Sequence, residues 1–443
     1  MRIASRAAFL VFAAAVAGPA CAAEDAPAAL PEPLTLEAAL ALAEEPHPDL
    51  VAAAADADIA RAGRDRAASA YGINAGVSAV ARWSEPADLA FDQTYNDSQA
   101  SVYLSKRLYD FGRTRAEVAA ADALVSSRRL DYLDARLQRG LDILARYLDV
   151  MLADLQFRAE DEAMATAYVR LDRAQDRHEL GQVSDIDLLE IETEYQEARS
   201  ARFLAQARQR TARVALAEAL NRPGQLSGTL VEPDLGHLDT EPPPLPALTE
   251  AVLRDNPRLQ SLRAAAEAGR ERLQAARALD RPVITGIARA SEYQRQTGST
   301  DPWSVGVQLE LPLYTGGRST AERAQARAEL TRNEAQLAQA ELRLRQDVHA
   351  LWEEIQVLRT SREEARTRLD FRELYLDRSR VLYEMEVNTD LGDAMVVSTE
   401  ARFRQAQLDY RLVLGWARLN ALRGRPLFAA HDEAATEQEG ERP

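Results

Sequence analysis

The chain of 443 residues contains two similar halves, and this internal repeat constrains its fold more than any other feature. The run LYDFGR at 108–113 returns as LYTGGR at 313–318, 205 positions later. The run HELGQVSD at 178–185 returns in diverged form as YEMEVNTD at 383–390, again 205 positions later. Self-similarity on this scale predicts two homologous halves that share one structural plan.

The repeat divides the chain into six segments. A cationic start, an apolar run at 7–17 and the small residues after it are typical of a secretory signal, and the run is too short to span a bilayer. The end of the chain is acidic and poor in apolar residues, which favours disorder. We therefore expect this division: signal peptide 1–23, N-terminal linker 24–33, first repeat 34–223, Pro-rich linker 224–246, second repeat 247–428 and disordered acidic tail 429–443.

Cys21 is the single cysteine, so no disulfide can form within the chain. Two interpretations of the signal stay open. Cleavage after Ala23 fits the small residues at the end of the signal, whereas lipidation would make Cys21 the first residue of a bacterial lipoprotein. A lipoprotein signal usually has Leu three residues before the cysteine, and this chain has Gly18 there.

Heptad spacing of apolar residues predicts long helices that coil on their neighbours. Abundant Ala and few chain breakers, 20 Gly and 19 Pro, favour the same structure. The pattern is unbroken over 112–178, which is about 100 Å of helix, and it recurs in the second half. Shorter helices are expected at 184–220 and 389–423, and opening helices at 36–70 and 247–280. Two short helices end to end match one long helix in length, so we expect them to stack beside it.

Between the opening helix and the long helix of each half, the apolar period changes to two. This pattern predicts β-hairpins at 72–109 and 283–314, with strands of about 10 residues, the length that crosses a membrane when tilted. Four strands cannot close a membrane barrel, and open sheet edges do not survive in lipid. Several chains would then have to share one barrel. The alternative is a soluble hairpin tip on a coiled-coil rod.

Charge and motifs argue against several other functions. The 54 basic and 70 acidic residues give a net charge of −16, whereas nucleic acid is bound through neutralised phosphates. The five histidines lie far apart, and no phosphate-binding loop, dinucleotide fingerprint or nucleophile elbow is present. We therefore expect no enzyme, no resident metal, no cofactor and no nucleic acid partner.

Several motifs in order resemble the TolC-type outer-membrane efflux protein family, over about residues 34–428. They are the run LTLEAAL at 34–40 with HPDL at 47–50, the two LY-x-x-GR runs, and the Gly181-x-x-Ser184 turn with its diverged partner at 386–389. The resemblance implies a mainly α fold with a β-barrel part. Long coiled-coil helices would form a trimeric α-helical barrel in the periplasm, and four strands per chain would form a shared 12-stranded β-barrel in the outer membrane of a Gram-negative bacterium.

The resemblance also implies the partners and a docking site. The partners would be two further copies of the chain, outer-membrane lipid, a periplasmic adaptor protein and an inner-membrane pump. The helix-turn-helix tips would form the periplasmic mouth, with these adaptor-facing residues: Gly181, Val183, Ser184, Val387 and Thr389. The alternative is that Gly181 only ends one helix and Ser184 only caps the next.

The family closes its periplasmic mouth with polar links and lines it with acidic rings. By resemblance, the aperture of this chain would involve Asp187, Glu190, Tyr383, Asn388, Asp390 and Asp393. The sequence departs from the family pattern, because Asn388 stands where a family arginine is expected, and Gly392 and Met395 stand where paired aspartates are expected. Asp390 and Asp393 could form a substitute ring, and the alternative is that these acids are solvated charges at helix termini.

The expected function is that of a passive outer-membrane channel in a tripartite efflux system, leading from the periplasmic adaptor and pump to the exterior. Its acidic passage would favour cations over anions. The outer-membrane channel of a type I protein secretion system is an alternative of the same class. A soluble, secreted coiled-coil scaffold or adhesin is an alternative of another class.

Overall fold

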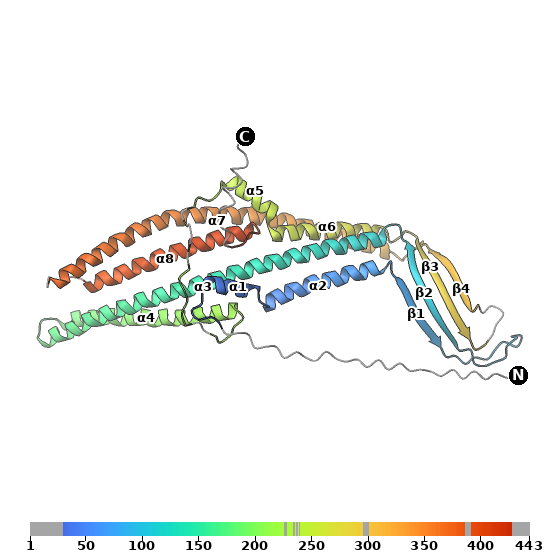
Figure 1. Cartoon of the computed structure of the whole chain (residues 1–443), viewed down its shortest axis with the longest axis horizontal. Helices are drawn as coiled ribbons and strands as arrows, with labels where there is room; N and C mark the ends of the chain where they lie inside the picture. Colours follow the sequence, from blue (N-terminus) through green and yellow to red (C-terminus); the bar gives the residue numbers. More distant parts are fainter. Residues whose placement is uncertain are drawn as a thin grey trace.

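The computed structural model describes residues 30–225, 228–233, 235, 238, 240–295, 301–385 and 391–427. The molecule is elongated, with a β-sheet at one end and helical tips at the other (Figure 1). Two long helices, α3 (Arg113–Glu179) and α7 (Arg318–Glu384), run from the sheet toward the tips, and each has 67 residues. The predicted long helices are confirmed. The expected signal peptide with Cys21, and the expected acidic tail, lie outside the described residues.

Four shorter helices pack along the two long ones. Near the sheet these are α2 (Pro48–Ser69) and α6 (Pro257–Arg277), and toward the tips they are α4 (Asp185–Ala219) and α8 (Leu391–Leu422). Helix α3 contacts all four, whereas α7 contacts only α6 and α8 among them (Figure 1). The helices therefore form a layer with α2 and α4 at one border and α7 at the other, and the predicted stacking of short helices is confirmed.

Each opening helix is broken in two, so the prediction of single helices at 36–70 and 247–280 is wrong. Helix α1 (Leu36–Ala41) and the short 3₁₀ helix η1 (Leu42–Glu44) precede α2, and α5 (Leu245–Asp255) precedes α6. The break has a local cause, because a proline disfavours helical backbone in the residue before it. That residue caps the next helix: His47 Nδ1 accepts from the Asp49 amide at 3.3 Å, and Asn256 Oδ1 accepts from the Leu259 amide at 2.9 Å.

The sheet contains one hairpin from each half. Its strands are β1 (Ile73–Val80), β2 (Gln99–Tyr109), β3 (Val283–Tyr293) and β4 (Trp303–Glu310), in the antiparallel order β1-β2-β3-β4. The central pair β2–β3 joins the two halves, and β1 and β4 form the edges. The four predicted strands are confirmed.

The repeated LY-x-x-GR motif converts a strand into a long helix. The glycine before the motif's arginine adopts positive φ in both halves, +91° at Gly112 and +84° at Gly317, which only glycine does without strain. In the first half, the buried carboxylate of Asp110 accepts a 2.8 Å hydrogen bond from the Thr114 amide. In the second half, Thr315 takes the place of that aspartate. The motif therefore turns the chain from strand into helix and satisfies the start of the helix in one step.

A belt of short segments covers one face of the helical layer at mid-length. It contains α1, η1, the bridge between Leu34 and Leu230, and α5. Tyr147 of α3 is fully buried beneath it, and its hydroxyl can donate to the carbonyl oxygen of Leu34 at 3.0 Å or to that of Val231. This hydrogen bond fastens the belt to α3.

Tyr410 of α8 is a second tyrosine of the core, with 2% of its surface exposed. Its hydroxyl has no hydrogen-bond partner among the described residues. Burial, reinforced by the nearby charge of Glu232, raises the pKa of Tyr410. The hydroxyl groups of the two buried tyrosines therefore contribute differently to the stability of the fold.

We predict that Tyr147→Phe lowers the free energy of unfolding by about 1 kcal/mol, because it removes the hydroxyl that hydrogen-bonds the belt to α3. Tyr410→Phe is the matched control, and it should cost nothing because the lost hydroxyl has no partner in the described structure. Urea titration in detergent, followed by circular dichroism, measures both. Equal losses for the two variants would contradict this account of the belt.

Candidate functional site

The four strands give the sheet two chemically different faces. Successive side chains of a strand point to opposite faces, and the register places Val77 opposite Val102, which lies opposite Ala290. On this face Val77 is 76% exposed, Val305 75% and Trp303 71%, so no part of the described chain covers it. The apolar face is formed by Ile73, Ala75, Val77, Ala79, Ala100, Val102, Leu104, Ala288, Ala290, Trp303, Val305, Val307 and Leu309, with Lys106 and Glu292 as its charged members.

The opposite face is mostly polar or small. This polar face is formed by Asn74, Gly76, Ser78, Val80, Gln99, Ser101, Tyr103, Ser105, Arg107, Val283, Thr285, Ile287, Arg289, Ser291, Tyr293, Ser304, Gly306, Gln308 and Glu310. A wall with one apolar and one polar face suits a boundary between lipid and water.

Both edges of the sheet are unpaired. Strands β1 and β4 each pair on one side only in the described chain, so their other backbone N–H and C=O groups are open to a further strand. Such edges template pairing with another chain, and lipid does not tolerate them.

The helical layer also ends in unpartnered borders. Helix α7 buries one stripe against α8 and α6, while a second stripe on the other side of the helix is exposed. At 100° per residue the exposed apolar positions stay within about 60° of one direction. They are Leu342, Val357, Phe371, Leu374 and Val381.

The other border carries a similar stripe. Helix α4 buries Ala205, Ala212 and Leu216 against the layer. Its opposite side exposes Ile186, Leu189, Phe203, Leu204 and Val214, and α2 continues the border with Val51 and Ile59. A helix with apolar residues on two sides needs two partners, and each border helix has one of them in this chain.

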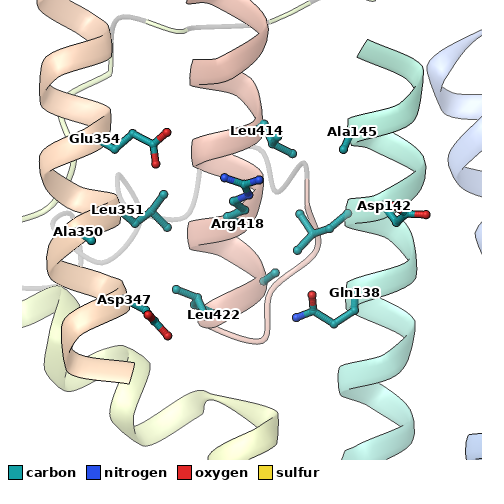
Figure 2. A pocket seen from close by; sticks show the side chains of 12 residues that line it. Gln138, Asp142, Ala145, Asp347, Ala350, Leu351, Glu354, Leu414, Arg418 and Leu422 are labelled. Atoms are coloured by element: carbon teal, nitrogen blue, oxygen red, sulfur yellow. The ribbon is translucent and has the colours of Figure 1, made fainter. Parts of the chain in front are cut away.

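An acidic groove lies between α3 and α7, beside the last turns of α8 (Figure 2). Its volume is about 520 Å³. Asp347 and Glu354 of α7 contribute carboxylates to its lining and Arg418 of α8 a guanidinium, while Asp142 of α3 lines it with its carboxylate turned toward the far side of the helix. The groove is therefore open and negatively charged, and it lacks the enclosed apolar shape of a small-molecule pocket.

Helical periodicity places the groove on the face opposite the belt. On α3 the groove is lined by Gln138, Leu141, Asp142 and Ala145, which share one side of the helix, whereas Tyr147, which hydrogen-bonds to the belt, lies on the opposite side. The acidic face continues toward the tips. Glu160 follows Asp142 by 18 residues, which is five full turns, so it lies on the same side of α3. Burial, and then the neighbouring charge of Glu400, raises the pKa of Glu160.

The first tip is a tightly bonded turn between α3 and α4. Gly181 has φ of +70°, and the amides of Gly181 and Gln182 donate at 2.8 Å to His178 and Arg177 carbonyl oxygens, which closes the end of α3. Ser184 Oγ accepts from the Asp187 amide at 3.2 Å and so caps α4. The expected capping roles of Gly181 and Ser184 are thus present in the described structure.

Large apolar side chains are exposed around this tip. Leu180 is 71% exposed and Ile186 78%, while Val183 is half-buried. At the end of α7, Tyr383 and Met385 are also exposed. Val387 and Thr389, the expected docking residues of the second tip, lie outside the described residues.

Of the expected aperture residues, the structure gives Asp393 a clear partner that sequence reasoning missed. Arg170 of α3 binds Asp393 of α8 at 2.6 Å and Glu194 of α4 at 3.1 Å. Gly392 lets α8 approach closely, since a Cβ there would stand 2.8 Å from Thr166 Cγ2. Arg170 carries no distinctive signal in the sequence, because α3 contains many arginines and only the packing selects this one.

The other aperture residues are not brought together in the described structure. Asp187 accepts a 2.8 Å hydrogen bond from the Ser184 hydroxyl, and Glu190 and Tyr383 are exposed. Within the described ranges, no hydrogen bond or ion pair joins these three to one another. Asn388 and Asp390 lie outside the described residues.

Of the helices described, none is both long and apolar enough to cross a membrane.

Comparison with known families identifies the class of protein to which these features belong. The sequence model of the outer membrane efflux protein family matches residues 39–222 and 248–425. The chain belongs to this family, as the resemblance in its motifs predicts. It is therefore an outer-membrane protein of a Gram-negative bacterium whose helices extend into the periplasm.

Individual relatives are distant but nearly as long as this chain. Outer membrane efflux protein BepC of Brucella suis biovar 1 (strain 1330) is 24% identical over 331 residues, which are 72% of this chain and 71% of BepC. Alkaline protease secretion protein AprF of Pseudomonas aeruginosa is 24% identical over 380 residues, 80% of this chain and 76% of AprF. The outer membrane protein VceC of Vibrio cholerae has the same fold, with a TM-score of 0.69 at 18% identity over 89% of this chain and 97% of VceC.

We predict that Arg170→Gln loosens the first turns of α8 from α3. Both ion pairs of Arg170 are half-exposed, so amide hydrogen exchange over 391–400 should rise only about threefold to fivefold. Exchange of the purified protein, followed by mass spectrometry, measures this. The matched control is Arg202→Gln, because Arg202 pairs with Asp161 at 2.5 Å and links α4 rather than α8 to α3. Unchanged exchange in the Arg170 variant would contradict the prediction.

Proposed function

We propose that the protein is a passive outer-membrane duct for efflux, assembled from three copies of the chain, and not an enzyme. The observation that carries this proposal is the pair of unpaired strand edges, β1 and β4, on a sheet with one exposed apolar face. A single copy cannot satisfy these edges in lipid. Pairing β4 of one copy with β1 of the next satisfies both and continues the sheet.

The number of copies follows from closure. Four strands per chain fall short of the 8 that the smallest bacterial membrane barrels have. Three copies give twelve strands, in keeping with the trimer that the family resemblance implies. The rotation that relates one copy to the next also brings the exposed stripe of α7 against the stripe of α4 and α2 on the next copy. Two different surfaces that meet head to tail form a ring when the rotation closes.

The arrangement of faces determines what lines the duct. The apolar face of the sheet meets lipid, so the polar face lines the barrel. The belt covers the outside of the helical layer, so the opposite face, with the groove of Asp142, Asp347 and Glu354, lines the periplasmic tunnel. The duct carries out no reaction on its cargo, because the cargo passes through a water-filled passage.

The tips are the proposed docking site for a periplasmic adaptor, with an inner-membrane pump beneath it. Exposed Leu180 and Ile186 flank the rigid turn at Gly181, and such apolar side chains are usual in docking surfaces. Val183, Ser184, Val387 and Thr389 complete the proposed surface. The aperture would be held by the Arg170–Asp393 link together with Asp187, Glu190, Tyr383, Asn388 and Asp390.

A second candidate function is the outer-membrane channel of a type I protein secretion system. The similarity to AprF, whose name assigns it to alkaline protease secretion, favours it. Both functions use the same duct and differ in the pump beneath it. The soluble scaffold is disfavoured, because a sheet with an uncovered apolar face and two open edges would aggregate in water.

We predict that Phe371→Asp together with Leu374→Asp converts the trimer into monomers. The two residues are 57% and 71% exposed in the single chain, and burying two carboxylates in an apolar contact between copies costs several kcal/mol. Light scattering on protein purified in detergent measures the mass of the assembly.

The matched control for the trimer is Val169→Asp, the same change at an exposed residue of α3, which lies inside the layer and away from both borders. It should leave the trimer intact. A monomeric wild-type protein in detergent would overturn the proposed duct.

We predict that Gly181→Val weakens adaptor binding at least tenfold while the trimer persists, because Val tolerates positive φ poorly and would distort the turn. Binding of the cognate adaptor to immobilised trimer measures the effect. Gly112→Val is the control, since it strains another positive-φ glycine with no atom within 4 Å of a Cβ, at the end of α3 far from the tips, and it should leave adaptor binding unchanged. Unchanged binding by the Gly181 variant would remove this turn from the docking surface.

A further inference from the structure

The polar face of the sheet carries an excess of arginine that the family comparison does not assign to any role. Arg82 and Arg295 lie just beyond the strands, at the loop end of this face, and share the carboxylate of Asp97. Arg295 binds Asp97 at 2.9 Å and also donates to the Ser84 hydroxyl at 3.1 Å. Two guanidinium groups on one carboxylate leave a net positive charge at this end of the sheet.

Arg289 adds a further positive charge in the middle of the same face. The register places it opposite Tyr103 of β2 and opposite Ser304 of β4. Its side chain is exposed, and among the described residues it forms no ion pair and no hydrogen bond. Within the described ranges, Arg289 is therefore an unpaired guanidinium on the face that lines the proposed barrel.

The neighbour of Arg289 is held away from it. Tyr103 lies over Gly76 of β1, so closely that a Cβ at Gly76 would stand 2.4 Å from the Tyr103 ring. Glycine at this position thus lets the aromatic ring lie flat on the sheet, on the side away from β3. The ring leaves the space in front of Arg289 uncovered.

The acids of this region lie at the two ends of the face. Glu310 is on the polar face but at its helix end, opposite Val283, and Glu85, Asp88 and Asp92 belong to the loop beyond the strands. The acidic groove of the tunnel lies on the helices, at mid-length of the molecule. The sign of the charge along the proposed passage therefore changes from negative in the helical part to positive in the barrel.

We propose that Arg289 forms an anion-binding ring inside the barrel, one guanidinium from each of three copies, and that this ring contacts carboxylate, sulfonate or phosphate groups of passing cargo. The inference rests on the proposed duct. A guanidinium binds such planar or tetrahedral anions through two parallel hydrogen bonds. Low-dielectric walls around a narrow passage focus its field, so three charges at one level select strongly among ions.

The test is ion selectivity of single channels in planar bilayers under a KCl gradient. Relative to the wild type, Arg289→Gln should raise the permeability ratio of K⁺ to Cl⁻ about twofold, and Arg289→Glu should raise it further. Lys106→Gln is the matched control. It removes one positive charge from the same sheet, but Lys106 lies on the apolar face, so the ratio should stay unchanged.

The outcomes separate the inference from the function on which it rests. Absence of channels from wild-type trimers would overturn the duct itself. Channels whose ion ratio is the same in the wild type and in both Arg289 variants would overturn the ring while leaving the duct. An equal shift for the Lys106 control would also overturn it, since the effect would then belong to net charge and not to a site.

Discussion

The sheet ends in two strands whose outer backbone groups have no partner within the described chain, and this constraint governs the rest of the molecule. Backbone N–H and C=O groups are strong hydrogen-bonding groups, and lipid offers them nothing. The apolar face favours contact with lipid, whereas unpaired edges are not tolerated there. Both conditions are met only if another strand pairs with each edge. The chain is in this sense one segment of a larger cylinder.

The helical layer obeys the same constraint with side chains instead of backbone groups. Helix α3 has neighbours on both sides, and it fastens the belt through Tyr147. Helices α7 and α4 each bury one apolar stripe and expose another. Sheet and layer end at the same two sides of the chain, so in the proposed trimer one rotation between copies satisfies both. Agreement between two independent surfaces is a stronger argument for a ring than either surface alone.

The two faces of the wall divide the charge of the protein. The acidic groove lies opposite the belt, whereas Arg289 and the Arg82–Asp97–Arg295 cluster lie on the polar face of the sheet. A net charge of −16 describes neither region. The sequence-based expectation of an acidic, cation-favouring passage stays a prediction for the helical part, and in the proposed duct the barrel has the opposite sign.

Periodicity, proline and glycine act locally, so the sequence by itself determined the two halves, both 67-residue helices, the four strands and the positive-φ turns at Gly112 and Gly181. Family membership also followed from motifs. The broken opening helices were within reach, because the proline after His47 and after Asn256 signals a new helix start. Other features needed the tertiary structure, because they join residues far apart in the chain. Arg170 meets Asp393 across 223 positions, and Tyr103 of β2 lies over Gly76 of β1, on the side away from Arg289 of β3.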